Sequence, residues 1–450
     1  MKGFVPTPSH IVDAMVGKLF GVRAPRADES LLDPGCGTGA FIEGVLRWCH
    51  QHHHPVPQIV GIESNPALLT EARRSLGKHK PVTLLNEDFL APRRERFDYV
   101  IGNPPYVPIT GLTIQERERY RSRYRTATGR FDLYLLFFEE ALRALLPEGR
   151  LVFITPEKFL YVETAEPLRK QLAEYFVEEI QLVDEATFGE LTTYPTITTV
   201  SRTPPGGKTR IRLRDGTTRQ VRLTAAGASW LPIATGDGAR AATHALADVC
   251  ARISCGVATG ADGVYVIRTS EVPASLRAFA YPTLSGREIT VGAGVTSAHS
   301  ILVPYDRTGT LLAEHDLGAL RGYLSEPDRR TRLMQRTCVS RKPWYAFHET
   351  PPLDEILRPK ILCKDIGSRP YFVVDARGDI VPRHSVYYLV PKDGTDLHEL
   401  AEFLNSKAAA SWLMGHCQRA ANGFVRLQSH VLKRMPVPEG LVRTEQLVWV

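Results

Sequence analysis

Residues 98–107, DYVIGNPPYV, decide the fold of this chain, because an apolar strand ends there in a rigid corner of polar and aromatic residues. The apolar run has the length of a buried strand, and Gly102 permits close approach of neighbouring atoms where the strand stops. Each proline fixes its own φ, offers no N–H and keeps the preceding residue out of the helical region. Asn103 and Pro104 are therefore expected to be extended, with oxygens free to accept. With the ring of Tyr106, they predict a receptor for a planar group that carries an NH₂.

A glycine loop upstream predicts a nucleotide-like ligand. Residues 33–39, DPGCGTG, follow a short apolar strand and precede a helix with apolar periodicity from residue 40 to about residue 49. Strand, loop and helix resemble the opening of a nucleotide-binding fold. The loop lacks the Lys-Ser/Thr ending of a P-loop, and Asp33 stands just before the glycines. This carboxylate would repel a pyrophosphate and attract an ammonium group.

Acidic residues also follow the next two expected strands. Glu63 comes after residues 59–62, and an acidic side chain at the tip of the second strand usually binds ribose hydroxyls. The third strand is expected at residues 84–88, which places Asp88 and Phe89 where they can bond and stack on an adenine. Amino acid, ribose and adenine together indicate S-adenosylmethionine. At the N-terminus, apolar periodicity predicts a helix up to residue 20, with Thr7 as its cap and proline at its first position.

Composition narrows the setting. The 450 residues suffice for two or three domains, 43% of them are hydrophobic and 23% are charged. No apolar run is long enough to span a bilayer, and the N-terminus lacks the basic region and apolar core of a signal peptide. Seven cysteines are scattered without a C-x-x-C pair, and the histidines of residues 50–54 have no partnering cluster. We therefore expect a cytoplasmic protein with reduced thiols, no membrane partner and no metal site.

Positive charge is concentrated in the second half of the chain. Residues 1–205 carry 24 Lys+Arg against 26 Asp+Glu, which leaves 32 against 23 for residues 206–450, so the halves carry −2 and +9. A surface of this kind suits a polyanion. Residues 329–332 and 341–345 place basic side chains near aromatic ones, as groove and phosphate contacts require. In residues 115–125, five arginines leave two hypotheses open, either contact with phosphates or a solvated helix with local charge pairs.

The second half is expected to be a separate domain. A breaker at residues 203–207 precedes a hairpin pattern at 210–214 and 220–223, and a Gly/Ala-rich linker runs to about residue 242. Further on, residues 397–414 predict a helix. We expect a catalytic domain of residues 1–243, with its core in residues 1–202, and a target-recognition domain of residues 244–450.

An ordered set of motifs carries a resemblance to a known family. Besides the glycine loop, the three acidic positions and the NPPY corner, the chain has FVPTP at residues 4–8, GRFDLY at 129–134, a strand at 151–155 and a segment at 188–200 with YPTI inside it. This set resembles the gamma class of amino-methylating DNA methyltransferases, of which the Taq-type adenine-N6 enzyme is the best known. The resemblance extends over nearly the whole chain, including GRE at residues 286–288 and PVP at 436–438.

The resemblance implies a role for individual residues. The cofactor-binding residues would be Thr7 and Asp33 at the methionine end, Gly35 and Gly37 in the glycine loop, Glu63 at the ribose, and Asp88, Phe89, Pro105 and Phe137 around the adenine. Catalysis would fall to Asn103 and the Pro104 carbonyl, which accept from the target amino group, with Pro105 in the same corner. Tyr106 and Phe188 would enclose the target base, and Tyr194 is the alternative to Phe188.

The sequence therefore predicts an α/β protein, with a Rossmann-like methyltransferase domain followed by a mixed α+β target-recognition domain. Its expected function is methyl transfer from S-adenosylmethionine to the exocyclic amino group of an adenine flipped out of duplex DNA. The resemblance implies a monomeric modification enzyme of a restriction–modification or phage-defence system, with a separate restriction endonuclease as a possible partner. Two alternatives stay open, a protein-glutamine methyltransferase and an RNA base methyltransferase.

Overall fold

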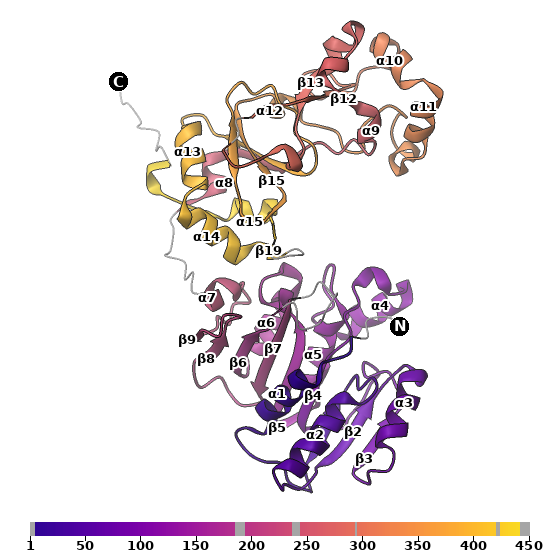
Figure 1. Ribbon diagram of the computed structural model, residues 1–450, viewed down its shortest axis with the longest axis vertical. Helices are drawn as coiled ribbons and strands as arrows, with labels where there is room; N and C mark the ends of the chain where they lie inside the picture. Colours follow the sequence, from indigo (N-terminus) through magenta and orange to yellow (C-terminus); the bar gives the residue numbers. More distant parts are fainter. Residues whose placement is uncertain (1–4, 185–193, 236–243, 293–294, 420–423, 442–450) are drawn as a thin grey trace. The chain divides into compact units, whose positions relative to one another are not determined.

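The protein consists of two compact units, Met1–Gly238 and Ala239–Val450. The structure, a computed structural model, describes residues 5–184, 194–235, 244–292, 295–419 and 424–441 (Figure 1). In these ranges no helix combines the length and apolar character that crossing a bilayer requires. The expected domain boundary between residues 243 and 244 borders residues 236–243, which the structure does not describe. The assignment of the two domains therefore stays a prediction.

The first unit alternates strands and helices along most of its length. Its elements are α1 (Ser9–Phe20), β1 (Ser30–Asp33), α2 (Ala40–Gln51), β2 (Gln58–Ile62), α3 (Pro66–Leu76), β3 (Val82–Leu85), β4 (Phe97–Gly102), α4 (Ile114–Arg123), α5 (Leu133–Ala144), β5 (Leu145–Pro156), α6 (Glu166–Leu172), β6 (Phe176–Leu182), β7 (Pro195–Ser201), β8 (Thr209–Arg212), β9 (Thr218–Val221) and α7 (Leu231–Thr235).

These nine strands form one sheet in the order β3-β2-β1-β4-β5-β7-β6-β8-β9. Strands β1 to β5 are parallel, and β7 runs antiparallel to both of its neighbours. The parallel strands bring their carboxyl ends to one edge, as the pairing of Asp33 with Gly61 shows. The loops that follow β1, β2, β3 and β4 consequently meet at this edge, where ligands bind in open α/β sheets.

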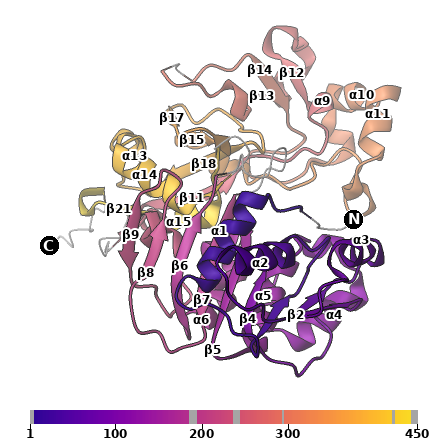
Figure 2. The ribbon, with the colours of Figure 1, turned by 60° about the horizontal axis from the view of Figure 1, so that its bottom comes forward.

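Helices cover both faces of this sheet (Figure 2). Buried side chains of α1, α2 and α3 share one core with Tyr99 and Ile101 of β4, whereas α5 and α6 share the other core with Val100. Successive side chains of a strand point to opposite faces, so the apolar run of β4 supplies both cores at once. The prediction of a buried strand before the NPPY corner is confirmed, with Asp98 the one half-buried residue of β4.

Two expectations for the first unit were wrong in detail. Pro8 occupies the N-cap of α1, and no side-chain oxygen caps this helix, so Thr7 is not its cap. Strand β3 ends at Leu85 rather than at residue 88, which leaves Asp88 and Phe89 in the loop before β4. The expected hairpin is confirmed, since β8 and β9 pair antiparallel, and β8 joins the sheet beside β6.

The second unit is built from smaller pieces. Its elements are β10 (His244–Ala245), α8 (Leu246–Val249), β11 (Cys250–Cys255), α9 (Asp262–Tyr265), β12 (Val266–Arg268), β13 (Ala280–Thr283), β14 (His299–Leu302), α10 (Ala319–Leu324), α11 (Pro327–Met334), α12 (Leu353–Ile356), β15 (Lys360–Lys364), β16 (Ile366–Gly367), β17 (Phe372–Asp375), β18 (Val386–Pro391), α13 (Leu397–Leu404), α14 (Lys407–His416), β19 (Gln418–Arg419), β20 (Val425–Arg426), α15 (Ser429–Lys433) and β21 (Pro436–Val437).

An antiparallel sheet, β11-β18-β15-β17, lies at the centre of this unit. One core packs it against α13, α14 and α15, and a second core connects it to β12, β13 and β14 and to the helices near residue 320. The predicted helix of residues 397–414 is wrong as a single element. It consists of α13 and α14, because Asn405 ends the first helix and Ser406 caps the second with its side chain.

Candidate functional site

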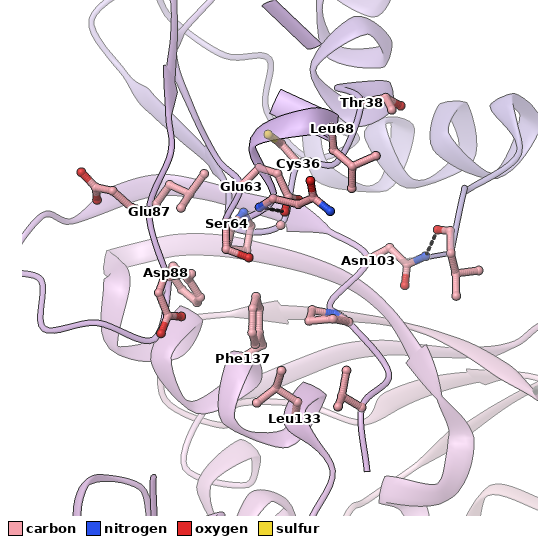
Figure 3. Close-up of a pocket in the computed structure, with 18 of the residues that line it drawn as sticks. Cys36, Thr38, Glu63, Ser64, Leu68, Glu87, Asp88, Asn103, Leu133 and Phe137 are labelled. Carbon is pink, nitrogen blue, oxygen red and sulfur yellow. Dashed lines mark hydrogen bonds between the residues drawn. The ribbon is translucent and has the colours of Figure 1, made fainter. Parts of the chain in front are cut away.

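A cavity of about 730 Å³ opens at the carboxyl edge of the parallel strands in the first unit. The loops after β1, β2, β3 and β4 line it, together with residues 5–7, the start of α5 and part of α4. Figure 3 shows Asp88 and Asn103 on opposite sides of this cavity, with the ring of Phe137 between them. The volume is in the range of pockets that hold a drug-sized ligand or a cofactor.

Asn103 has one oxygen acceptor that is left over. Its side-chain Nδ2 donates to the carbonyl oxygen of Val5 at 3.1 Å and to Oγ1 of Thr7 at 3.0 Å. Its Oδ1 is buried and has no hydrogen-bond partner within the described residues. A buried amide oxygen without a partner has a free-energy cost, which a ligand donor would remove. The side chain is therefore held in place by its nitrogen, and both Asn103 and Thr7 line the cavity.

Asp33 lies beneath the glycine loop and is completely buried. Burial raises the pKa of its carboxyl to about 8, the Gly35 amide opposes this shift and the Glu63 carboxylate adds to it. A Cβ on Gly102 would lie 3.1 Å from Oδ1 of Asp33, so the glycine at the end of β4 leaves the space that this carboxyl occupies. The close approach predicted at Gly102 is confirmed. Asp33 does not line the cavity, whereas Gly35 and Cys36 above it do.

Glu63 connects the glycine loop to the start of α3. One carboxylate oxygen accepts from the Gly37 amide at 3.0 Å, and the other accepts from the Asn65 amide at 2.7 Å. Asn65 in turn caps α3. Gly37 has a φ of 54°, which favours glycine, and its bonded amide lies outside the cavity lining. Glu63 does line the cavity, with its carboxylate fixed by two backbone amides.

Two aromatic rings form an apolar part of the cavity wall. Phe89 and Phe137 lie with their ring centroids 5.2 Å apart and their planes at 47°. A Cβ on Gly35 would lie 3.7 Å from the Phe137 ring and 3.9 Å from Cδ of Pro105. These three residues, all expected around the cofactor, therefore lie next to one another in the cavity wall. Asp88 lies beside Phe89, and its Oδ1 accepts from the Leu90 amide at 2.9 Å. The site thus combines flat apolar surfaces with fixed carboxylates.

Of the residues expected around the target base, Pro104 and Tyr106 follow β4, and Tyr194 directly precedes β7. Pro104 is buried, and the Tyr106 hydroxyl lies 3.5 Å from the carbonyl oxygen of Ile154 in β5. The Tyr106 ring makes an edge contact with Tyr134, and burial raises its pKa. Phe188 lies outside the described residues. Tyr194 lies at the start of β7, where its carbonyl oxygen accepts from the Glu157 amide.

Three lining residues come from a segment that the sequence did not assign to the cavity. Leu112, Glu116 and Tyr120 come from α4 and the turn before it. The spacing of Glu116 and Tyr120, four residues apart on a helix, was the available signal, but the five arginines around them suggested either phosphate contact or a solvated helix. Across the described ranges, no group of three or more His, Cys, Asp or Glu side chains is placed to hold a metal ion.

Each half of the chain contains a segment that matches a known protein family. Residues 63–188 match the family described as Eco57I restriction-modification methylase, and residues 323–437 match the TaqI-like C-terminal specificity domain. A release factor glutamine methyltransferase of Moorella thermoacetica is 34% identical, but over 27% of this chain and 45% of that protein. The similarity to the glutamine enzyme therefore extends over about a quarter of this chain.

Similarity over the full length comes from restriction–modification proteins. The type II methyltransferase M.PaeR7I of Pseudomonas aeruginosa is 30% identical over 97% of this chain and 86% of its own length. The solved structure of the type IIL restriction-modification enzyme MmeI in complex with DNA has the same fold over 97% of this chain and 63% of that chain, with a TM-score of 0.62 and 13% identity. The expected methyltransferase fold followed by a specificity domain is confirmed. The chain belongs to the family of type II methyltransferases, the DNA methyltransferases of restriction–modification systems.

Proposed function

We propose that this methyltransferase uses S-adenosylmethionine and methylates the exocyclic amino group of an adenine turned out of duplex DNA. The observation that carries this proposal is the buried, unpartnered Oδ1 of Asn103 at the cavity. An acceptor fixed in this way suits a ligand with an N–H donor, and the amino group of a base has two. The bonded nitrogen, together with an oxygen that has no partner among the described residues, distinguishes Asn103 from an ordinary surface asparagine.

The cofactor would lie along the cavity from the glycine loop to Asp88. Glu63 would accept from the ribose hydroxyls, and Asp88 would accept from the adenine amino group, with Phe89 and Phe137 against the ring. Asp33 would contribute negative charge beneath Gly35, which favours an ammonium group above the loop, since Coulomb attraction is stronger in a buried setting. Thr7 would also contact the methionine end of the cofactor. When bound, S-adenosylmethionine supplies a methyl group on a sulfonium, which is an activated electrophile.

The chain itself would orient the amine that attacks this methyl group. Asn103 Oδ1 and the Pro104 carbonyl would accept from the two amino hydrogens, which favours electron density and pyramidal geometry at the nitrogen. In-line placement would supply much of the acceleration, so no strong base is required. A stacked base cannot reach such a site, and Tyr106 would receive the flipped base with Phe188 or Tyr194 on its other side.

The second unit would hold the DNA. Its similarity to a specificity domain and its share of the positive half of the chain support this role. Arg330 illustrates the chemistry, because its exposed guanidinium lies 4.4 Å from the ring centroid of Trp344. Such a stacked arginine is preorganised to meet a phosphate. We further propose a cytoplasmic monomer that protects host DNA from a separate endonuclease.

The decisive experiment is sequencing of modified bases in DNA from a host that lacks its own adenine methylation and expresses the protein. N6-methyladenine at one recurring sequence is the expected result, and the same DNA from cells with the Asn103→Ala protein serves as the control. Methylated cytosine, or methylation that is absent from DNA but present in RNA or in a protein glutamine, would refute the proposal. Competition between duplex DNA and structured RNA for the purified protein tests the RNA alternative directly.

A further inference from the structure

The loop of residues 88–91, here named the pocket wall, forms the end of the cavity where Asp88 and Phe89 lie. This wall follows β3 but makes few of its bonds with the sheet. Inside the wall, Asp88 accepts from the Leu90 amide, and its carbonyl oxygen accepts from the Ala91 amide at 2.9 Å. Phe89 and Leu90 are both buried. The remaining hydrogen bonds of the wall come from a different part of the chain.

Helix α4 and the residue after it supply these bonds. Arg123 donates from Nη1 to the Leu90 carbonyl at 2.9 Å and from Nη2 to the Ala91 carbonyl at 3.2 Å. The Tyr124 hydroxyl donates to the same Leu90 carbonyl at 3.1 Å. The Arg123 side chain is 25% exposed, and its Nη2 also lies 3.4 Å from the buried carboxylate of Glu140 in α5. The Arg123 guanidinium is therefore bonded to protein acceptors on two segments, the pocket wall and α5.

A second arginine reaches the wall one turn earlier. Arg119 forms an ion pair with Asp88 at 3.2 Å, and the same Nη2 donates to the hydroxyl of Tyr120 at 3.2 Å. The guanidinium also lies 5.0 Å from the Tyr120 ring centroid. The pocket wall thus receives bonds from two arginines of this segment. The bonded wall residues are 31 to 33 positions away in sequence, so these bonds are not local pairs along the helix.

Helix α4 borders the same cavity as the wall it holds. Glu116 and Tyr120 line the cavity from α4, while Asp88 and Phe89 line it from the wall. The first turn of α4 is fixed by Thr113 and Glu116, whose side chains and amides bond each other. A ligand between the helix and the wall would therefore contact two segments that Arg123 ties together, and ligand binding would favour their closed arrangement.

We propose that Arg123 is a positioning residue for the cofactor. Its hydrogen bonds hold the pocket wall against α4 and so keep the adenine end of the cavity closed. This inference rests on the proposed use of S-adenosylmethionine. It assigns Arg123 to retention of the cofactor rather than to contact with DNA phosphates. Arg119 would assist through its ion pair with Asp88. Arg123 reaches two neutral carbonyls and one buried carboxylate from two nitrogens of its planar guanidinium, whereas a lysine would have to reach them from one nitrogen.

The test compares Arg123→Ala and Arg123→Lys with Arg125→Ala, whose exposed side chain lies just beyond α4. Titration calorimetry with S-adenosylmethionine and steady-state kinetics on duplex DNA give the readouts. For Arg123→Ala, Kd and KM for the cofactor should rise about tenfold or more, which corresponds to about 1.4 kcal/mol. Its kcat at saturating cofactor and the salt dependence of its DNA binding should stay at the wild-type values. Arg123→Lys should recover part of the affinity, and Arg125→Ala should keep all of it.

Two results would overturn the inference while leaving the proposed function in place. One is wild-type cofactor affinity in Arg123→Ala; the other is unchanged cofactor affinity with a weaker salt dependence of DNA binding, which identifies a phosphate contact. Failure of the wild-type protein to bind S-adenosylmethionine would refute the proposed function itself. If Arg123→Ala does not fold, hydrogen exchange on the wild-type chain decides. The cofactor should slow exchange in α4 and in residues 88–91 together, and slowing in neither overturns the clasp.

Discussion

Replacing Asp33 by asparagine should stabilise the cofactor-free protein at alkaline pH and weaken its binding of the cofactor. Asp33 is 0% exposed, and neither carboxylate oxygen has a hydrogen bond of ordinary geometry within the described part of the chain. Burial raises its pKa from the ordinary value of 3.8 to about 8. Asparagine has nearly the same shape and carries no charge, so the substitution removes the cost of ionisation without opening a cavity.

The sign follows from proton binding. The folded protein retains a proton on Asp33 at pH values where the unfolded chain has lost it, so the stabilisation is complete below pH 4 and is lost as the pH rises towards 8. Each pKa unit corresponds to about 1.36 kcal/mol, which sets an upper bound of roughly 6 kcal/mol for the loss. The new amide group is itself buried and costs about 1–3 kcal/mol. A net gain of roughly 3 kcal/mol at pH 8 is therefore expected for Asp33→Asn.

Thermal unfolding of the full-length protein between pH 5 and pH 8.5 measures this effect. The wild-type transition of the first unit should fall more steeply with pH, and at pH 8 the variant should unfold roughly 6–12 °C higher. Asp28→Asn is the matched control, because the Asp28 side chain is 77% exposed and its charge stays in water. Parallel pH profiles for wild type and Asp33→Asn, or a lower transition for the variant at pH 8, would refute the reasoning.

Cofactor binding gives an independent readout of the same substitution. An ammonium group above the loop favours ionised Asp33, so wild-type affinity should fall by up to about tenfold per pH unit below pH 8. The affinity of Asp33→Asn should be lower and nearly independent of pH in this range. Calorimetry at pH 6, 7 and 8 makes the comparison. Equal affinities for the two proteins would remove Asp33 from the methionine end of the proposed site.

Three further predictions concern single sites. Asn103→Ala should lower methylation of duplex DNA by about 10²-fold or more while calorimetry shows a change in cofactor Kd of less than about tenfold, because it removes an acceptor for the target; wild-type turnover would contradict this. Arg330→Ala should reduce the slope of log K against log salt by about one in filter binding, and an unchanged slope would show that the guanidinium on Trp344 meets no phosphate. Lys360→Ala should destabilise the second unit by about 3–5 kcal/mol in thermal unfolding, because it leaves the buried Asp375 carboxylate without its ion pair at 2.6 Å; a loss below about 1 kcal/mol would contradict the cost assigned to the buried charge.

Local patterns predicted the elements that depend on short stretches of sequence. The glycine loop, strand β4 and the NPPY corner depend on backbone restrictions at glycine and proline, which operate within a few residues. Errors arose where a neighbour decided the outcome. Thr7 has the side chain of a helix cap, but its hydroxyl accepts from Asn103, which is 96 residues away. Strand β3 ends at Leu85, and beyond it Leu90 bonds with Arg123 of α4 and with Asp88 of its own loop.

The arginine-rich segment shows the same limit at the level of function. Its composition permitted contact with phosphates or pairing along the helix, and neither hypothesis included the bonds of Arg119 and Arg123 to the pocket wall. Charge in a sequence gives the number of available donors. The acceptors depend on which segments the fold brings together, and a guanidinium satisfied by protein carbonyls is no longer available to DNA.

By itself, the sequence determined the order of motifs, the methyltransferase class and the expected set of cofactor and target residues. Spacing along the chain and the restricted dihedral angles of glycine and proline suffice for this, because parallel strands bring the ends of successive motifs to one edge. The tertiary structure alone decided which atoms of these residues are free. It bonds Nδ2 of Asn103 to Val5 and Thr7 and leaves Oδ1 without a hydrogen-bond partner among the described residues. It also buries the carboxyl group of Asp33, which raises the pKa of that group. Hydrogen bonding and desolvation depend on neighbours distant in sequence, which only the folded chain supplies.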